Sequence, residues 1–253
     1  MDVMLQEFPG DSRIHRLRIV ALKESDFNQS NRLAIGHPLL HALEDANDLP
    51  SMQYGSRPAK QYISAVLNKI LQLEIHRNYK EPLAYIENDA VGCYERIMNP
   101  LILLTLCQFG VPQTVLWSLA ATWAATSQKV KTIYGILDQS YTNSSDYFLY
   151  GPEQGSTIGP ILWLLCFLLK YRSLSSSTVG MEFSSVDRTI HAKSKGAAFV
   201  DDTGLGCNVS PQSYLDKVLG QQSHEARIDQ NLLKLSQEWE RLLYSTGGRP
   251  KSK

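Results

Sequence analysis

The chain has no excess of charge of either sign. Its 25 lysine and arginine residues balance 25 aspartate and glutamate residues, so the formal net charge at pH 7 is zero. A chain without net charge generates no global field that would draw it to nucleic acid or to an anionic membrane surface. Any affinity for a polyanion must therefore come from local basic patches.

Cysteine and long apolar runs are also scarce. The four cysteines stand far apart, without the short paired spacings of a zinc site or a compact disulfide framework. The longest apolar run, residues 158–169, is interrupted by Gly159 and Pro160, and residues 1–10 carry acids but no apolar core. We therefore expect reduced thiols, no signal peptide, no membrane span and an intracellular location, in the nucleus or cytoplasm.

The sequence does have the composition of a packed protein. Hydrophobic residues make up 43% and charged residues 20% of its 253 positions, which excludes wholesale disorder, and this length suffices for two subdomains. Basic residues gather in two segments, residues 13–23 and residues 57–80, and the second segment also has helical apolar spacing. Such segments suit contacts with phosphates, although a basic helix face is more simply a solvated one.

Local patterns predict the main secondary-structure elements. Apolar periodicity and proline or glycine boundaries predict helices over residues 97–109, 112–125, 160–171 and 213–244. Polar and serine-rich composition predicts turns at residues 139–146 and 173–178.

Two acidic positions follow apolar runs with the pattern of β-strands. Asp89 follows the run at residues 82–88, and Asp201 and Asp202 stand at the tip of a hairpin expected over residues 196–208. Strand ends hold carboxylates rigidly, and phosphoryl-transfer enzymes commonly use two metal ions bound by such carboxylates. An Asp-Asp pair before Thr-Gly is also ordinary turn chemistry, so the pair alone does not establish a site.

Four short motifs stand in a fixed order along the chain. They are QYGSRP at residues 53–58, NDAVGCYERI at 88–97, PEQGSTIGP at 152–160 and AFVDD at 198–202. Together they resemble the reverse transcriptases, particularly those of non-LTR retrotransposons and group II introns, over residues 16–248. The resemblance implies an α+β fold with right-hand polymerase fingers and palm, a small antiparallel palm sheet backed by helices, and no thumb.

The resemblance also implies how the chain is divided into subdomains. The fingers would comprise residues 1–80 and 111–150, and the palm residues 81–110 and 151–248, followed by a tail at residues 249–253. We expect no endonuclease or ribonuclease H module within this length.

The activity implied by the resemblance is RNA-directed DNA polymerisation. An RNA template, a DNA primer and dNTPs would be the partners, and two Mg²⁺ ions, or Mn²⁺ in their place, would be the cofactors. Asp89 and Asp201 would bind the two ions, with Asp202 supporting the site. Ions held in this way serve in-line nucleotidyl transfer by activating the primer 3′-hydroxyl and neutralising the triphosphate.

Further residues are assigned to the nucleotide and template by the same resemblance. Tyr94, five positions after the first acidic residue, would lie beneath the sugar and exclude a 2′-hydroxyl. Arg18 would grip the triphosphate, because a guanidinium fork suits phosphate oxygens. Gln154 and Gly155 would pack against the incoming nucleotide and the templating base, and Arg57 would contact the template.

The sequence leaves two other functions open. One is a catalytically inactive nucleic-acid-binding remnant of a truncated retroelement, which the expected absence of a thumb favours. The other is a two-metal nuclease, in which Tyr94 and the loop around Gln154 would have no role. Val200 and Glu153 depart from the family pattern, since a small residue commonly precedes the acidic pair and an uncharged one precedes the glutamine.

Overall fold

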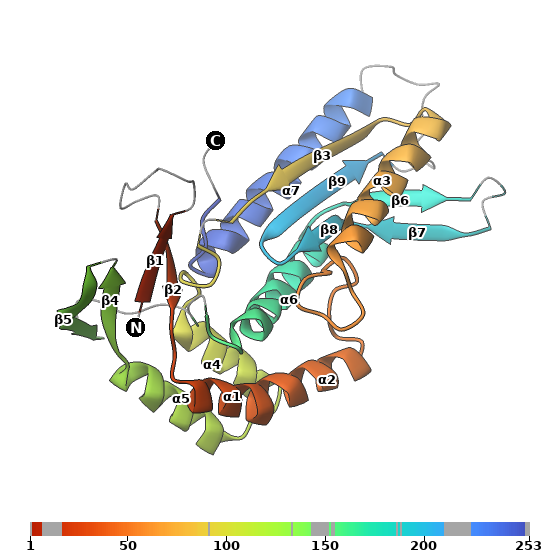
Figure 1. Ribbon diagram of the computed structural model, residues 1–253. Helices are drawn as coiled ribbons and strands as arrows, with labels where there is room; N and C mark the ends of the chain where they lie inside the picture. The colour runs from red at the N-terminus through yellow and green to blue at the C-terminus, as the bar shows by residue number, and fades with distance from the viewer. Residues whose placement is uncertain are drawn as a thin grey trace. The chain divides into compact units, whose positions relative to one another are not determined.

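The structure is a computed structural model that describes residues 2–6, 17–90, 92–132, 134–142, 152, 155–185, 187, 189–209 and 224–250. The chain divides into two compact units, which we call unit 1 (Met1–Asp45 and Gly92–Cys166) and unit 2 (Ala46–Val91 and Phe167–Lys253). Each unit therefore combines two separate stretches of the chain, as the colours of Figure 1 show.

Unit 1 contains a four-stranded sheet and several helices (Figure 1). The strands are β1 (Asp2–Gln6), β2 (Leu17–Ala21), β4 (Ser127–Thr132) and β5 (Gly135–Thr142), in the order β2-β1-β4-β5. The β1–β4 pair is parallel and the other two pairs are antiparallel. The helices are α1 (Ser25–Asn31), the π-helix η2 (Arg32–Gly36), α2 (His37–Asp45), α4 (Asn99–Gln108), α5 (Gln113–Ala125) and the first part of α6 (Gly159–Ser177).

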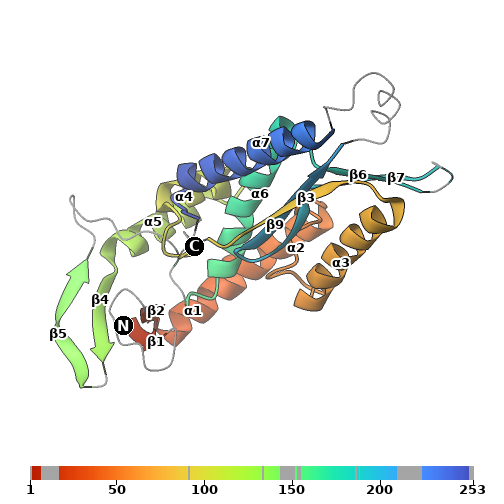
Figure 2. The ribbon, with the colours of Figure 1, turned by 90° about the horizontal axis from the view of Figure 1, so that it is seen from above.

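Unit 2 is built on a three-stranded antiparallel sheet in the order β3-β9-β8. Its strands are β3 (Leu83–Asn88), β8 (Gly196–Phe199) and β9 (Asp202–Asn208), and the hairpin of β6 (Met181–Ser184) and β7 (His191–Ser194) lies beside them. Helix α7 (His224–Ser245) packs on one face of the sheet and α3 (Tyr62–Tyr79) lies on the other (Figure 2). The β8–β9 pair confirms the hairpin predicted at residues 196–208.

The core of unit 2 lies between the sheet and α7. Leu205 and Cys207 of β9 are fully buried, as is Leu235 of α7, and the Cys207 thiol lies 3.8 Å from the carbonyl oxygen of Ile228. Side chains alternate along a strand, so Asp202 and the glycines of β9 face the opposite side, where α3 lies. This alternation places apolar residues against α7 and leaves small and acidic residues on the other face.

Helix α3 confirms the helical spacing of residues 57–80, although it begins at Tyr62 rather than Arg57. Ala65, Gln72 and His76 are its buried residues. Four of its large apolar residues are instead between 49% and 64% exposed: Ile63, Leu67, Ile70 and Leu71. The apolar spacing therefore identifies the helix but not the side of the helix that faces the sheet.

The two compact units are a division by packing, and the expected fingers and palm ranges stay a prediction. Residues 46–80, expected in the fingers, belong to unit 2, because Gln53 forms a bridge with Ala198 of β8 and α3 packs on the same strand. Residues 92–110, expected in the palm, belong to unit 1, where α4 packs against α5. Contacts between distant segments decide this division, and sequence order does not reveal them.

Two of the predicted turns are regular structure. Helix α6 continues through residues 173–177, where the Ser177 hydroxyl donates to the Ser173 carbonyl oxygen at 2.9 Å, a bond that lets serine remain in a helix. Strand β5 runs from Gly135 to Thr142, so residues 139–142 are strand rather than turn. The strand begins at Gly135, whose φ of 123° favours glycine. Residues 143–150 and 210–223 lie outside the described part of the chain.

Within the described ranges, no helix combines the length and apolar character needed to cross a membrane.

The cysteines yield a direct prediction about thiol reactivity. All four are thiols outside any disulfide; Cys93, Cys166 and Cys207 are buried and Cys107 is exposed. Burial raises the pKa of Cys207 to about 11, so its reactive thiolate form is rare at neutral pH. We expect one thiol to react quickly with an aromatic disulfide reagent at pH 7.5, and all four in guanidinium chloride. Fast reaction of three or four thiols in the native protein would contradict the packing described here.

Candidate functional site

The register of β3 and β9 brings two of the predicted carboxylates together. Asn88 of β3 pairs with Thr203 of β9. Because the strands are antiparallel, Asp89 follows Asn88 on one strand where Asp202 precedes Thr203 on the other. Residues placed opposite each other in this way have neighbouring side chains. Two acidic residues far apart in the sequence therefore meet at one end of the strand pair.

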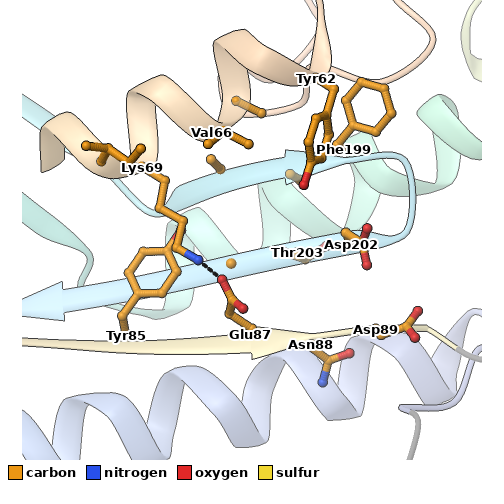
Figure 3. A pocket seen from close by; sticks show the side chains of 15 residues that line it. Tyr62, Val66, Lys69, Tyr85, Glu87, Asn88, Asp89, Phe199, Asp202 and Thr203 are labelled. Carbon is orange, nitrogen blue, oxygen red and sulfur yellow. Dashed lines mark ion pairs between the residues drawn. The ribbon is translucent and has the colours of Figure 1, made fainter. Parts of the chain in front are cut away.

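Both carboxylates line a cavity of about 670 Å³ in unit 2. The cavity lies between α3 and the face of the sheet opposite α7, and Figure 3 shows Asp89 and Asp202 at one end of it. Tyr62 and Phe199 stand nearby in an edge-to-face pair with ring centroids 5.3 Å apart. The site thus combines two acidic groups with an aromatic wall in a space large enough for a nucleotide-sized group.

The third carboxylate, Asp201, lies in the turn that joins β8 to β9. Phe199 pairs with Asp202, so Val200 and Asp201 are the two turn residues. Val200 has a φ of 56°, which is a true outlier for a β-branched residue. Asp201 does not belong to the described residues that line the cavity, whereas Asp89 and Asp202 do. The metal-binding roles predicted for the three carboxylates stay predictions.

The far end of the cavity holds a second charged group, which the sequence motifs do not reveal. Lys69 of α3 forms an ion pair with Glu87 of β3, and its ammonium lies 5.2 Å from the ring centroid of Tyr85 (Figure 3). Burial raises the pKa of Tyr85 to about 12, so this phenol is neutral at physiological pH. The sequence signals are the basic segment at residues 57–80, which contains Lys69, and the alternation of Tyr85, Glu87 and Asp89 along one strand face.

Arg57 is placed within the loop that precedes α3. Its guanidinium donates hydrogen bonds to the carbonyl oxygens of Pro50, at 2.8 Å, and Gln53, at 3.2 Å. The bond to Gln53 lies within the QYGSRP segment, and the bond to Pro50 ties that segment to the chain that precedes it. The structure therefore gives Arg57 a stabilising role within unit 2, which is separate from the predicted contact with a template.

We expect Arg57→Ala to lower the free energy of unfolding by about 1–3 kcal/mol, because two carbonyl groups lose a charged donor. Urea unfolding measured by circular dichroism tests this value. Arg77→Ala is the matched control, since the Arg77 side chain is 79% exposed and pairs with Glu74 within the same helix. Equal stability losses in the two variants would show that the Arg57 bonds do not stabilise the loop.

The remaining predicted site residues that the structure describes belong to unit 1. Arg18 lies in β2, where its backbone pairs with Leu5 of β1. The Tyr94 ring packs at 57° to the ring of Trp163, with centroids 6.3 Å apart. Gly155 has a φ of 103°, and its carbonyl oxygen accepts a hydrogen bond from the Asn28 side chain at 3.0 Å. Gln154 lies outside the described residues.

Gly155 lies directly against β2. A Cβ atom at this position would overlap the carbonyl oxygen of Ala21, so the backbone of residue 155 can approach the strand only because it is glycine. Asn28 secures the loop, since its side-chain oxygen also accepts a bond from the Thr157 N–H at 3.1 Å. The structure therefore brings Gly155 beside β2, the strand that contains Arg18.

The carboxylates at the cavity fit the chemistry of Mg²⁺. In the described part of the chain, no three histidine, cysteine, aspartate or glutamate side chains form a preassembled metal cluster. Mg²⁺ commonly takes only one or two carboxylates from the protein and completes its octahedral shell with waters and substrate phosphates. Asp89 and Asp202 supply that number of ligands at one place.

Comparisons with known proteins identify the fold. No protein-family model matches the chain, and no curated protein matches its sequence. The structure of telomerase from Candida albicans, solved with the TWJ fragment of telomeric RNA, matches 94% of this chain at 13% identity with a TM-score of 0.56. Two Candida tropicalis telomerase structures match 93% and 82% of the chain, at 13% and 12% identity, with TM-scores of 0.49.

The match covers part of a larger protein, because the chain spans 39% of the length of the C. albicans telomerase chain. Telomerase is related to the reverse transcriptases through its catalytic subunit, and at 13% identity the likeness concerns the fold alone. The chain has a mixed α+β fold similar to that of the C. albicans telomerase chain.

Proposed function

We propose that the chain is the fingers and palm part of an RNA-directed DNA polymerase that transfers nucleotides from dNTPs to a primer. The observation that carries the proposal is the meeting of Asp89 and Asp202 at one end of a cavity in unit 2. The two residues come from motifs that stand in reverse-transcriptase order in the sequence. The fold shared with telomerase supports the same conclusion.

In this proposal the chain's own residues position the reactants. Asp89 and Asp202 would hold two Mg²⁺ ions, with Asp201 beside them in the turn, and ions bound there would lower the charge barrier to in-line attack on a triphosphate. Lys69 and the aromatic pair of Tyr62 and Phe199 line the space beside these carboxylates, where a primer strand would lie. The assignment of Arg18 to the triphosphate, and of Gln154 and Gly155 to the incoming nucleotide and the templating base, rests on the sequence motifs alone.

An RNA template and a DNA primer are the proposed partners. The C. albicans telomerase structure contains a fragment of telomeric RNA, which supports a nucleic-acid ligand for this chain as well. A retrotransposon or group II intron origin rests on the four sequence motifs. The alternative function, an inactive nucleic-acid-binding remnant, uses the same surfaces without nucleotide transfer.

The proposal is tested by incorporation of labelled dTTP on a poly(rA) template with an oligo(dT) primer. We expect incorporation that requires the primer, the template and Mg²⁺, and that stops when the metal is chelated. Binding of the primer–template without incorporation would support the remnant instead. Template cleavage without incorporation would support the nuclease.

Tyr94→Ala tests the proposed selection against ribonucleotides. Removal of the ring takes away the steric barrier to a 2′-hydroxyl, so incorporation of UTP relative to dTTP is expected to rise by about tenfold or more. Trp163→Phe is the matched control, because it changes the partner ring but leaves Tyr94 in place. An unchanged ribose preference in Tyr94→Ala would remove the steric role.

A further inference from the structure

The turn that carries the acidic pair has a costly backbone conformation. Val200 has a φ of 56°, where a β-branched side chain collides with its own backbone. The next residue is Asp201, and β9 begins immediately after it with Asp202. If Val200 relaxed to a negative φ, the direction of the chain through both carboxylates would change. The surrounding structure must therefore hold this residue in place.

One buried side chain bonds both backbone polar groups of Val200. The amide oxygen of Gln53 accepts the Val200 N–H at 3.0 Å, and the amide nitrogen of Gln53 donates to the Val200 carbonyl oxygen at 3.1 Å. Gln53 is fully buried, which shields its side of these bonds from water. A carboxylate cannot donate to the Val200 carbonyl oxygen, and a hydroxyl side chain is too short to reach both the N–H and the carbonyl group of Val200. A side-chain amide can bond to both.

The backbone on both sides of Gln53 is also locked to the hairpin. The Tyr54 N–H donates to the Ala198 carbonyl oxygen at 2.8 Å, and the Ala198 N–H donates to the Met52 carbonyl oxygen at 2.8 Å. The Gln53 oxygen accepts a further bond from the Gly55 N–H at 2.9 Å. A Cβ atom at residue 55 would overlap the Val200 backbone, so only glycine fits there.

We infer that Gln53 is a positioning residue of the proposed catalytic site, where its amide holds Val200 at positive φ and thereby directs Asp201 and Asp202. The inference rests on the proposed polymerase function for its catalytic consequence. It assigns a role to the Gln-Tyr-Gly part of the QYGSRP motif, which acts through the turn and touches no substrate. A displacement of about 1 Å at a reacting group can lower a rate about a hundredfold, so loss of this hold has a large effect.

Gln53→Met is the first test, because methionine has a similar length and cannot form the three hydrogen bonds. We expect kcat for dTTP incorporation to fall by about a hundredfold, with KM for dTTP within about twofold of the wild-type value. Gln72→Met is the matched control in the same unit. Gln72 is also buried, 5% exposed, and bonds to Ser194 in β7, away from the acidic turn, so its kcat is expected to be unchanged.

A second test separates positioning from general stability. Glycine adopts a positive φ at little cost, so Val200→Gly removes most of the strain that Gln53 opposes. In the Val200→Gly background, Gln53→Met is expected to lower kcat by only about tenfold or less. The difference from the hundredfold loss in the wild-type background measures the coupling between the two residues. A purely structural role for Gln53 would give the same fold-loss in both backgrounds and would overturn the inference.

A third measurement needs no catalysis, so it distinguishes failure of this inference from failure of the proposed function. Amide hydrogen exchange at Val200 and Gly55 is expected to become at least about tenfold faster in Gln53→Met, while the amides of α7 keep their wild-type rates. Unchanged exchange at these two amides would overturn the inference even if the polymerase is active. If Gln53→Met does not fold, Gln53→Glu replaces it: the carboxylate keeps the two accepted bonds, and exchange is then expected to stay slow at both amides.

Discussion

Asp89→Asn is expected to lower metal-dependent dTTP incorporation by at least about a thousandfold, and Asp202→Asn by a similar factor. The reason is that a neutral amide binds Mg²⁺ far more weakly than a carboxylate, and the bound metal supplies several kcal/mol of transition-state stabilisation, at about 1.4 kcal/mol for each factor of ten. Both side chains line the same end of the cavity, so each variant removes a ligand from one site. Asp201→Asn is expected to show a comparable loss.

Thermal stability separates this effect from misfolding. Two neighbouring carboxylates repel each other, so the melting temperature of Asp89→Asn in the absence of metal is expected to equal or exceed that of the wild type. Asp229→Asn is the matched control, because Asp229 is an exposed aspartate on α7 of the same unit. Full incorporation by Asp89→Asn would show that the cavity is not the site of nucleotide transfer.

Gly155→Ala is expected to lower the free energy of unfolding of unit 1 by about 3 kcal/mol or more. The added Cβ overlaps the carbonyl oxygen of Ala21, and the φ of 103° is itself unfavourable for alanine. Relief requires the loop to move away from β2, which is the strand that contains Arg18. Urea unfolding followed by tryptophan fluorescence reports on this unit, since Trp117, Trp123 and Trp163 lie in it.

Gly110→Ala provides a matched control for the steric part of this effect. Gly110 also has a positive φ, 78°, but no atom within 4 Å of the position of an added Cβ. Its substitution is expected to cost about 1 kcal/mol, from backbone conformation alone. Equal losses in Gly155→Ala and Gly110→Ala would mean that the close approach of residue 155 to β2 does not contribute.

The local elements of this fold could be predicted from the sequence because their signals lie within a few residues. Proline at position 100 begins α4, and an apolar run followed by Asp201 and Asp202 marks the β8–β9 hairpin. The strand pattern before Asp89 likewise predicts β3. Antiparallel pairing of β3 with β9 then places the two acidic ends together. The order of the sequence motifs indicates this pairing, whereas the apolar periodicity of each strand alone does not.

The contacts that orient the site could not be predicted in this way. Gln53 and Val200 are 147 positions apart, and their hydrogen bonds depend on the path of the chain between residue 46 and α3. The sequence motif singles out Arg57 in that segment, whereas the buried amide of Gln53 holds the acidic turn. Long-range packing also explains why residues 46–80 join unit 2, a grouping that no local pattern expresses.

The exposed apolar side of α3 affects how the isolated protein behaves in concentrated solution. Ile63, Leu67 and Leu71 recur at four-residue intervals, so their side chains form one continuous patch. A chain with zero net charge at pH 7 also lacks the repulsion that keeps molecules apart. Self-association is therefore expected to grow with sulfate, which strengthens apolar contacts, and to weaken as the pH moves away from neutrality. The apolar patch on α3 therefore favours purification without sulfate, and the zero net charge favours a pH well away from 7.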